Sequence, residues 1–150
     1  MKTVLSICLA VAFSQVAFAD EKSSDRKTAD DQKALQGDWT PVKAELAGQP
    51  MPEAVLKTIS LKLVKNEYEV LVGDKPDKGT WTIDATTKPK SMKITGVKGP
   101  NKGKTFPAIY ELTDDTLRVC YDLSGKKLPT EFKTKADTKL YLVTYKRKKK

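Results

Sequence analysis

The stretch ISLKLVKNEYEVLV, residues 59–72, decides the fold. Ile59, Leu61 and Leu63 alternate with polar residues, and a similar alternation resumes after a Lys-Asn pair. Successive side chains of a strand point to opposite faces, so this period of two predicts two strands that each bury one face. The polar pair between them predicts a turn, and we expect the two strands to form an antiparallel hairpin.

The same pattern extends in both directions along the chain. Clusters of Gly, Pro, Asn and Asp separate the apolar runs and predict turns, and PEAVLKT at residues 52–58 predicts one short helical turn because Pro52 suits a first helical position. Consecutive strands with short connections predict an all-β fold, an eight-stranded up-and-down antiparallel barrel. We expect the strands at residues 39–46, 59–63, 68–72, 81–83, 92–94, 106–112, 116–122 and 139–146.

The first 19 residues predict a signal peptide. Lys2 precedes an apolar run, and Ala17-Phe18-Ala19 has the small-x-small form that signal peptidase recognises. The apolar run is far shorter than the roughly 20 residues that a membrane span needs. We therefore expect an exported protein, periplasmic or secreted, with no transmembrane segment after cleavage.

The rest of the chain divides by composition. Residues 20–34 are charged and almost free of apolar side chains, which predicts a flexible leader. Residues 35–147 form the predicted barrel domain, and residues 148–150 a basic tail. The net charge of +9 owes much to the last five residues, all Lys or Arg, so it says little about the barrel itself. We expect a monomer.

The composition excludes several kinds of catalytic site. The chain has no histidine, so Ser-His and Cys-His nucleophilic sites are impossible and the commonest metal ligand is missing. The Asp30-Asp31 pair falls in the charged leader, and Asp114-Asp115 between two apolar runs indicates a turn. The sequence predicts no catalytic residues, no metal and no cofactor, and hence a protein that is not an enzyme.

One motif resembles a nucleotide-phosphate loop. GPNKGKT at residues 99–105 has three residues between its first glycine and the Gly-Lys pair, where a phosphate loop has four. A strand-like run with Pro107 follows it, where a phosphate loop opens a helix. The stretch therefore predicts a hairpin connection.

Five blocks in order carry a resemblance to a known family: LQGDW, GPNKGKTFPAIYEL, DDTLRVCYD, LPTEF and LVTYKR. Together they resemble the small exported lipocalin-like domain that occurs in many copies in planctomycete bacteria. The resemblance covers residues 35–147 and implies an eight-stranded barrel of lipocalin type, with no established biochemical activity.

The same resemblance implies a structural motif at one end of the barrel. Gly37 and Trp39 match the Gly-x-Trp that begins the first strand, and Arg147, or else Lys146, matches the basic residue that stacks on the tryptophan. The alternative is that both basic residues belong to a solvated tail.

Three features could carry a function. A barrel of this size holds either side chains or one small ligand. Some of its aromatic residues should point inward, where they either fill the core or line a ligand site, with Arg118 or a tyrosine hydroxyl orienting a polar group. The candidate ligand-binding residues are Tyr68, Trp81, Tyr110, Arg118 and Tyr121.

The second feature is a lysine-rich stretch between residues 85 and 110 that holds no acidic residue. It predicts a positive surface that could attract an anionic envelope polymer, lipid headgroups or nucleic acid, of which nucleic acid is the least expected. The alternative is that its lysines only keep strands soluble and unpaired at their edges. The candidate residues are Lys88, Lys90, Lys93, Lys98, Lys102 and Lys104.

The third feature is Cys120, the only cysteine left after signal cleavage. Arg118 lies two residues earlier, on the same strand face, and a guanidinium there could favour a reactive thiolate. The alternative is a small buried apolar residue.

These features predict a non-enzymatic binding protein that holds a small apolar or amphipathic molecule in the barrel. The alternative is an envelope-associated protein that contacts anionic polymers or partners through its lysines. The volume of the barrel interior discriminates between the two hypotheses.

Overall fold

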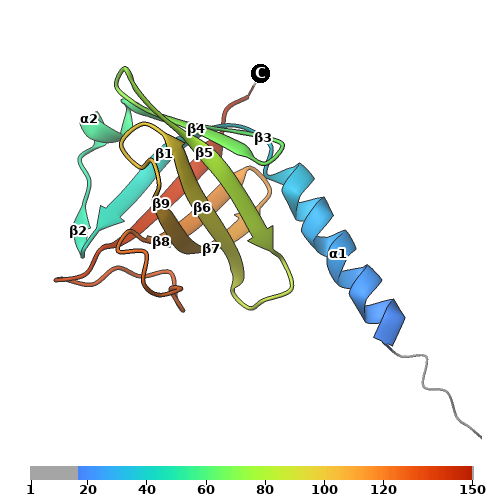
Figure 1. Cartoon of the computed structure of the whole chain (residues 1–150). Coiled ribbons are helices and arrows are strands. Elements are labelled where there is room, and N and C mark those ends of the chain that lie inside the picture. Colours follow the sequence, from blue (N-terminus) through green and yellow to red (C-terminus); the bar gives the residue numbers. More distant parts are fainter. Residues whose placement is uncertain (1–16, 150) are drawn as a thin grey trace, which may run out of the picture.

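The computed structural model describes residues 17–149, which form a β-barrel with a helix projecting from one end (Figure 1). Residues 1–16, which hold most of the predicted signal peptide, and residue 150 lie outside the described part. The helices are α1 (Ala17–Ala34) and α2 (Glu53–Leu56). The strands are β1 (Gly37–Leu46), β2 (Gln49–Pro50), β3 (Ile59–Val64), β4 (Glu67–Val72), β5 (Lys75–Asp84), β6 (Lys90–Lys98), β7 (Thr105–Thr113), β8 (Thr116–Asp122) and β9 (Leu140–Arg147).

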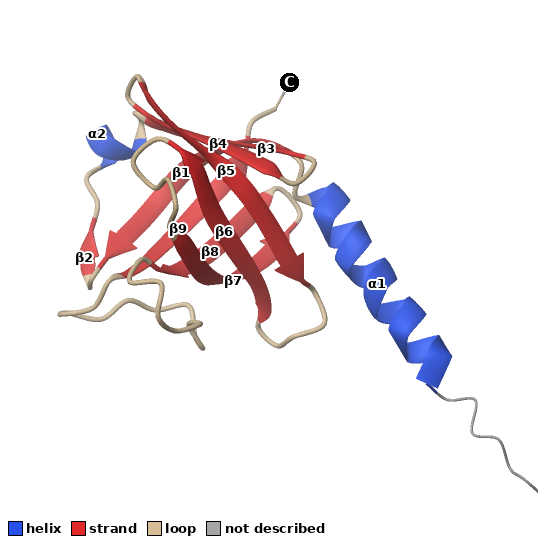
Figure 2. Cartoon of the chain, viewed as in Figure 1, coloured by secondary structure: helices blue, strands red, loops and turns tan. Residues whose placement is uncertain are grey.

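The barrel closes through the pairing of its first and last strands. The strands follow one another in the order β1-β3-β4-β5-β6-β7-β8-β9, every neighbouring pair is antiparallel, and β1 also pairs with β9. The short β2 pairs only with β1 and stays outside the barrel. The predicted eight-stranded up-and-down antiparallel barrel is confirmed, and Figure 2 shows how little helix accompanies it. The predicted helical turn at residues 52–58 corresponds to α2.

Strand β5 begins earlier than the sequence predicts. The prediction placed a turn across residues 73–79, whereas β5 starts at Lys75. Pro76 can belong to β5 because it lies in an edge segment of that strand. It pairs with Leu71 of β4, and the pairing of β5 with β6 begins only at Lys78. Gly79 then lies where the register with β6 shifts, and a Cβ there would come within 2.0 Å of the Thr95 carbonyl oxygen. Both residues thus belong to the strand.

The connections from β3 to β8 are short, as predicted, and the connection from β1 to β3 holds β2 and α2. Residues 123–139, between β8 and β9, form a long irregular segment that we call the β8–β9 loop. Its sequence is polar and lysine-rich and lacks apolar alternation, so it cannot add a strand that buries one face. Loops of this length inside a compact domain are uncommon, and they are usually either functional or linker-like segments.

The structure of the charged leader differs most from its prediction. Residues 20–34 were predicted to be flexible, but they are helical and form most of α1. The helix has no apolar stripe, and for this reason the sequence pattern missed it. Instead, Ser24, Thr28 and Asp31 form a polar stripe of partly buried residues at helical spacing.

Hydrogen bonds dock the end of α1 onto the barrel wall. The Asp31 carboxylate accepts from the Lys90 ammonium at 2.6 Å and from the Tyr110 hydroxyl at 2.8 Å, and the Thr28 hydroxyl oxygen accepts from the Ala85 amide at 3.3 Å. Tyr110 is only 1% exposed, so its hydroxyl depends on Asp31 as acceptor. The helix is therefore held by polar contacts.

One end of the barrel is sealed. The Arg147 guanidinium lies 4.2 Å from the centroid of the Trp39 ring, the arrangement that the resemblance implied. It also donates to the carbonyl oxygens of Ala34 and Gln36, both at 2.6 Å, and to the Asp115 carboxylate at 3.1 Å. The indole of Trp39 donates to the Leu35 carbonyl at 2.9 Å. These contacts tie β1, β9 and the end of α1 together, and we call this the closed end.

The core near the closed end is solid. Leu35, Trp39, Trp81 and Tyr110 are each at most 1% exposed and belong to one apolar cluster. The Trp81 indole donates to the Glu67 carbonyl at 3.1 Å, near the β3–β4 turn. Large aromatic side chains thus fill this half of the barrel.

We expect Arg147→Lys to destabilise the fold by about 1–3 kcal/mol, because an ammonium cannot stack flat on Trp39 while it donates to two carbonyls. Urea unfolding measures this. Lys149→Ala, two residues on and beyond β9, is the matched control and should leave the free energy of unfolding unchanged. Equal midpoints for the two variants would contradict the role given to Arg147.

We expect Asp31→Ala to cost about 1–3 kcal/mol, because it leaves the buried Tyr110 hydroxyl without an acceptor. It should also free α1, so trypsin should cut within residues 20–33 much faster than in the wild type. Asp30→Ala, on the exposed side of α1, is the control. Similar cleavage rates in all three proteins would show that α1 does not depend on Asp31.

Candidate functional site

The other half of the barrel is hollow. A cavity of about 350 Å³ lies among inward-facing side chains, a volume typical of small-molecule sites. Most of its wall is aliphatic or aromatic. The lining residues are Leu46, Met51, Val55, Ile59, Leu61, Leu63, Tyr68, Val70, Val72, Asp77, Met92, Ile94, Asn101, Phe106, Leu117, Val119, Tyr121, Leu123, Tyr141 and Tyr145.

The cavity opens away from the closed end. Leu46, Val55 and Val72 line it and are 41%, 39% and 49% exposed, so they mark its mouth. They come from the end of β1, from α2 and from the end of β4, which meet at the pole opposite α1 (Figure 1). The mouth of the cavity is therefore bordered by exposed apolar side chains.

One polar cluster interrupts the apolar wall. The Asp77 carboxylate is 8% exposed and accepts from the Tyr68 hydroxyl at 3.1 Å, from the Asn101 amide at 3.1 Å and from the Asn101 side chain at 2.8 Å. Burial, and then the charge of Asp77, raise the pKa of Tyr68 above its ordinary value, so its hydroxyl stays a donor. The cluster fixes residues 99–104 against the cavity wall.

Three further tyrosines share the cavity. The rings of Tyr121 and Tyr141 stack with centroids 5.9 Å apart, and Tyr145 lies on the same strand as Tyr141, on the same face. Burial raises the pKa of Tyr141 to about 12 and raises the pKa of Tyr121 and of Tyr145 as well. All three hydroxyls are therefore neutral at physiological pH and can donate hydrogen bonds.

The structure divides the predicted ligand-binding residues into three groups. Tyr68 and Tyr121 line the cavity. Trp81 and Tyr110 are buried in the solid half and are absent from the lining. Arg118 lies on the outer face of β8, where its guanidinium stacks 4.3 Å from the Phe132 ring centroid and pairs with Glu111. Arg118 therefore cannot orient a ligand inside the barrel.

Cys120 also faces outward on β8, under the β8–β9 loop. It is fully buried, and its thiol donates to the Lys133 carbonyl at 3.6 Å. Burial raises the pKa of the thiol, which disfavours the thiolate. The geometry matches the small buried residue that the sequence offered as the alternative.

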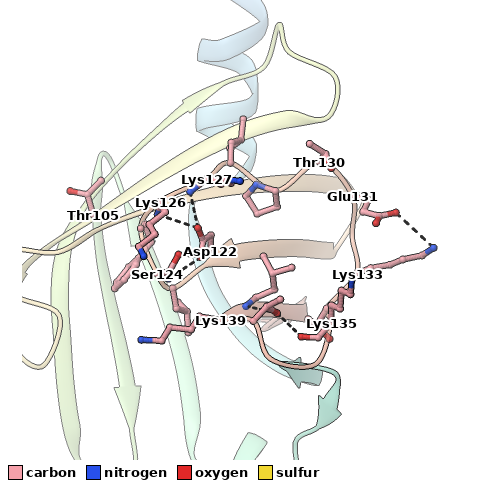
Figure 3. Close-up of a pocket in the computed structure, with 18 of the residues that line it drawn as sticks. Thr105, Asp122, Ser124, Lys126, Lys127, Thr130, Glu131, Lys133, Lys135 and Lys139 are labelled. Carbon is pink, nitrogen blue, oxygen red and sulfur yellow. Dashed lines mark hydrogen bonds and ion pairs between the residues drawn. The ribbon is translucent and has the colours of Figure 1, made fainter.

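A second, larger hollow of about 1430 Å³ lies between the β8–β9 loop and residues 101–106 (Figure 3). We call it the lysine vestibule. Figure 3 shows Asp122 and Ser124 at the start of the loop, with Glu131 and Lys133 on its opposite arm. The lysines that line the vestibule are Lys104, Lys126, Lys127, Lys133, Lys135 and Lys139.

Asp122 anchors the start of the loop. Its carboxylate accepts from the Ser124 amide at 2.9 Å, from the Ser124 hydroxyl at 2.6 Å, and from the amides of Lys126 and Lys127 at 3.1 and 2.8 Å. Burial alone would raise the pKa of Asp122, but these hydrogen bonds, led by that of the Ser124 hydroxyl, hold it below the usual 3.8. The loop is thus fixed where it leaves β8.

A second anchor holds the far arm of the loop. The Thr134 hydroxyl donates to the Glu45 carboxylate of β1 and accepts from the Gly48 amide at 2.9 Å. With the Cys120–Lys133 contact, this ties the loop to the barrel at three separate points. The vestibule is therefore bounded by a loop that is anchored to the barrel on both arms.

The six lysines predicted as one anionic-partner surface are spread along the length of β6 and its two flanking connections. Lys88 and Lys90 lie near the closed end, where Lys90 pairs with Asp31. Lys93 lies midway along β6, and Lys98 and Lys102 lie beyond it toward the mouth. Only Lys104 lines the vestibule. The denser group of lysines belongs to the β8–β9 loop.

Sequence reasoning missed Asp77, Asn101 and the tyrosines of β9. Asp77 shares a face with Gly79 and Trp81, but the turn predicted there hid the alternation. The last strand has a visible alternation in its sequence, and its inward-facing residues could have been assigned from it: Tyr141, Val143 and Tyr145. Asn101 comes from a connection, so no periodicity points to it.

Within residues 17–149, no three carboxylate or cysteine side chains come together as metal ligands do. Neither helix of the described part combines the length and the apolar composition that crossing a membrane requires. No family model, curated protein or solved structure matches the chain. The resemblance to the planctomycete lipocalin-like domain therefore stays a prediction.

We expect the anchor at Asp122 to titrate below pH 3.8. Its pKa is lower folded than unfolded, so the stabilisation is complete above the unfolded value and disappears as the pH falls through the folded value. The amide proton shifts of Lys126 and Lys127 should move together, with a midpoint below 3.8. Asp122→Asn should abolish this titration. A midpoint above 3.8 would contradict the hydrogen-bonded carboxylate.

Proposed function

We propose that the protein is a non-enzymatic binding protein that holds a small apolar or amphipathic molecule in the open half of its barrel. The observation that carries the proposal is the cavity of about 350 Å³ with a largely apolar wall and an apolar mouth. Side chains could have filled the barrel throughout, as they do near Trp39 and Trp81. The hollow half supports the proposal, because an interior that served only stability could have been filled by side chains.

The composition of the wall supports the same function. Burial of an apolar ligand surface contributes about 25 cal/mol per Å², and few polar groups face the cavity to oppose it. Asp77, Asn101 and the tyrosine hydroxyls can orient one polar part of the ligand. An apolar lining with a few placed polar groups is the usual composition of a small-molecule site.

The proposal includes export. Lys2, the apolar run and Ala17-Phe18-Ala19 support a signal peptide, so we place the binding activity in the periplasm or outside the cell. A protein with one cysteine in its predicted mature part relies on packing and not on disulfides there.

We expect Nile red, a neutral apolar dye, to bind with a rise in fluorescence, and Ile94→Trp to weaken this binding by at least about tenfold because the indole occupies ligand volume. Ile94 faces the cavity from β6. Val97→Trp is the matched control: Val97 is on the same strand, faces outward and is 57% exposed.

Thermal unfolding of both variants separates loss of the cavity from loss of the fold. Two results would overturn the proposal: no dye binding to the wild type, or dye binding to a folded Ile94→Trp variant with wild-type affinity.

A further inference from the structure

The lysine vestibule and the barrel cavity adjoin. Asn101, Phe106 and Leu123 line both hollows, so they form the boundary between them. Phe106 and Leu123 present apolar surface toward the barrel, whereas the loop beyond them carries charge. A molecule that spans this boundary would therefore have one part in a charged space and the other in an apolar one.

The vestibule has an excess of positive charge. Six lysines line it against three carboxylates, those of Asp122, Glu131 and Asp137. Asp122 is engaged with the amides of the loop, and Glu131 lies 3.8 Å from Lys133. Within residues 17–149 none of the other five lysines forms an ion pair. Their charges are thus available to a negatively charged group.

The cavity wall carries a negative charge, in contrast to the positive vestibule. The Asp77 carboxylate is buried among the lining residues, and no described lysine or arginine pairs with it. A negative group inside the barrel would be repelled by it across a medium that screens poorly. Asp77 therefore keeps an anionic head out of the cavity, while the lysines attract that head to the vestibule.

We infer that the ligand is a single-chain anionic amphipath whose apolar tail occupies the barrel cavity and whose carboxylate or phosphate head lies among the lysines of the β8–β9 loop. This inference rests on the proposed function. The three anchors of the loop fix its backbone before the ligand arrives, so that only the lysine side chains need to be ordered on binding. The positive field of the vestibule also steers an anion toward it.

Calorimetric titration with four decyl compounds tests the head group at constant tail. We expect decanoate and decyl phosphate to bind about tenfold or more tighter than decanol, because several lysines act on one anion, and decylamine to bind weakest. Raising the salt from about 0.02 to about 0.2 M should narrow the difference, since exposed charges are screened. Decanol should still bind through its tail.

Lysine variants test which part of the surface causes the preference for an anionic head group. Lys126→Gln, Lys127→Gln and Lys139→Gln combined should remove most of the preference for decanoate over decanol. The matched control combines Lys43→Gln, Lys62→Gln and Lys93→Gln, which removes the same charge from exposed positions on other strands. The control should keep most of the preference. Lys126 and Lys127 donate to the Asp122 carboxylate only through their backbone amides, so both hydrogen bonds remain possible after the side chains are changed.

The outcomes separate this inference from the function on which it rests. If decanol binds as tightly as decanoate, or if both triple variants lose the preference equally, the head-group site is wrong and the apolar cavity stands. If decylamine binds tightest and Asp77→Asn abolishes that binding, the cavity recognises a cation and the inference is overturned. If no decyl compound binds, the proposed function fails as well.

Discussion

The stacking of Arg147 on Trp39 seals one end of the barrel, and the asymmetry between its two ends depends on this contact. A guanidinium that also donates to the carbonyls of Ala34 and Gln36 satisfies backbone groups that the end of α1 would leave without partners. Leu35 and the indole of Trp39 then fill the space beneath. Both tryptophans of the chain pack in this sealed half, and the hollow remains in the other half, among tyrosine and aliphatic side chains.

Much of the barrel could be predicted because its physical signal is local. The alternation of apolar and polar residues in residues 59–72 predicts two strands that each bury one face. The other strands show the same pattern, and their observed ends differ from the predicted ends by a few residues. The solid half was partly predictable, since Gly37, Trp39 and Arg147 fit a resemblance. The burial of Tyr68, Trp81 and Tyr110 follows from strand parity, but whether each lines a cavity depends on packing that no single strand specifies.

The rest depends on contacts between distant residues. Helix α1 is held by Asp31, Lys90 and Tyr110, which are far apart in sequence, so its charged composition resembled that of a flexible segment. The Asp77 cluster needs Asn101 from another connection. The lysines of the β8–β9 loop gather only because Asp122 and Thr134 fold that segment back over the barrel. Pairings of this kind leave no periodic trace in the sequence.

The position of the chain ends has a practical consequence. The described chain leaves α1 and β9 at the same pole, and the mouth faces the opposite one (Figure 1). A fusion partner, an affinity tag or a surface linkage at either end of this segment would stand behind the barrel, with its opening directed toward the bulk solution. An immobilised form of the protein would therefore keep the mouth of the cavity exposed to the solution.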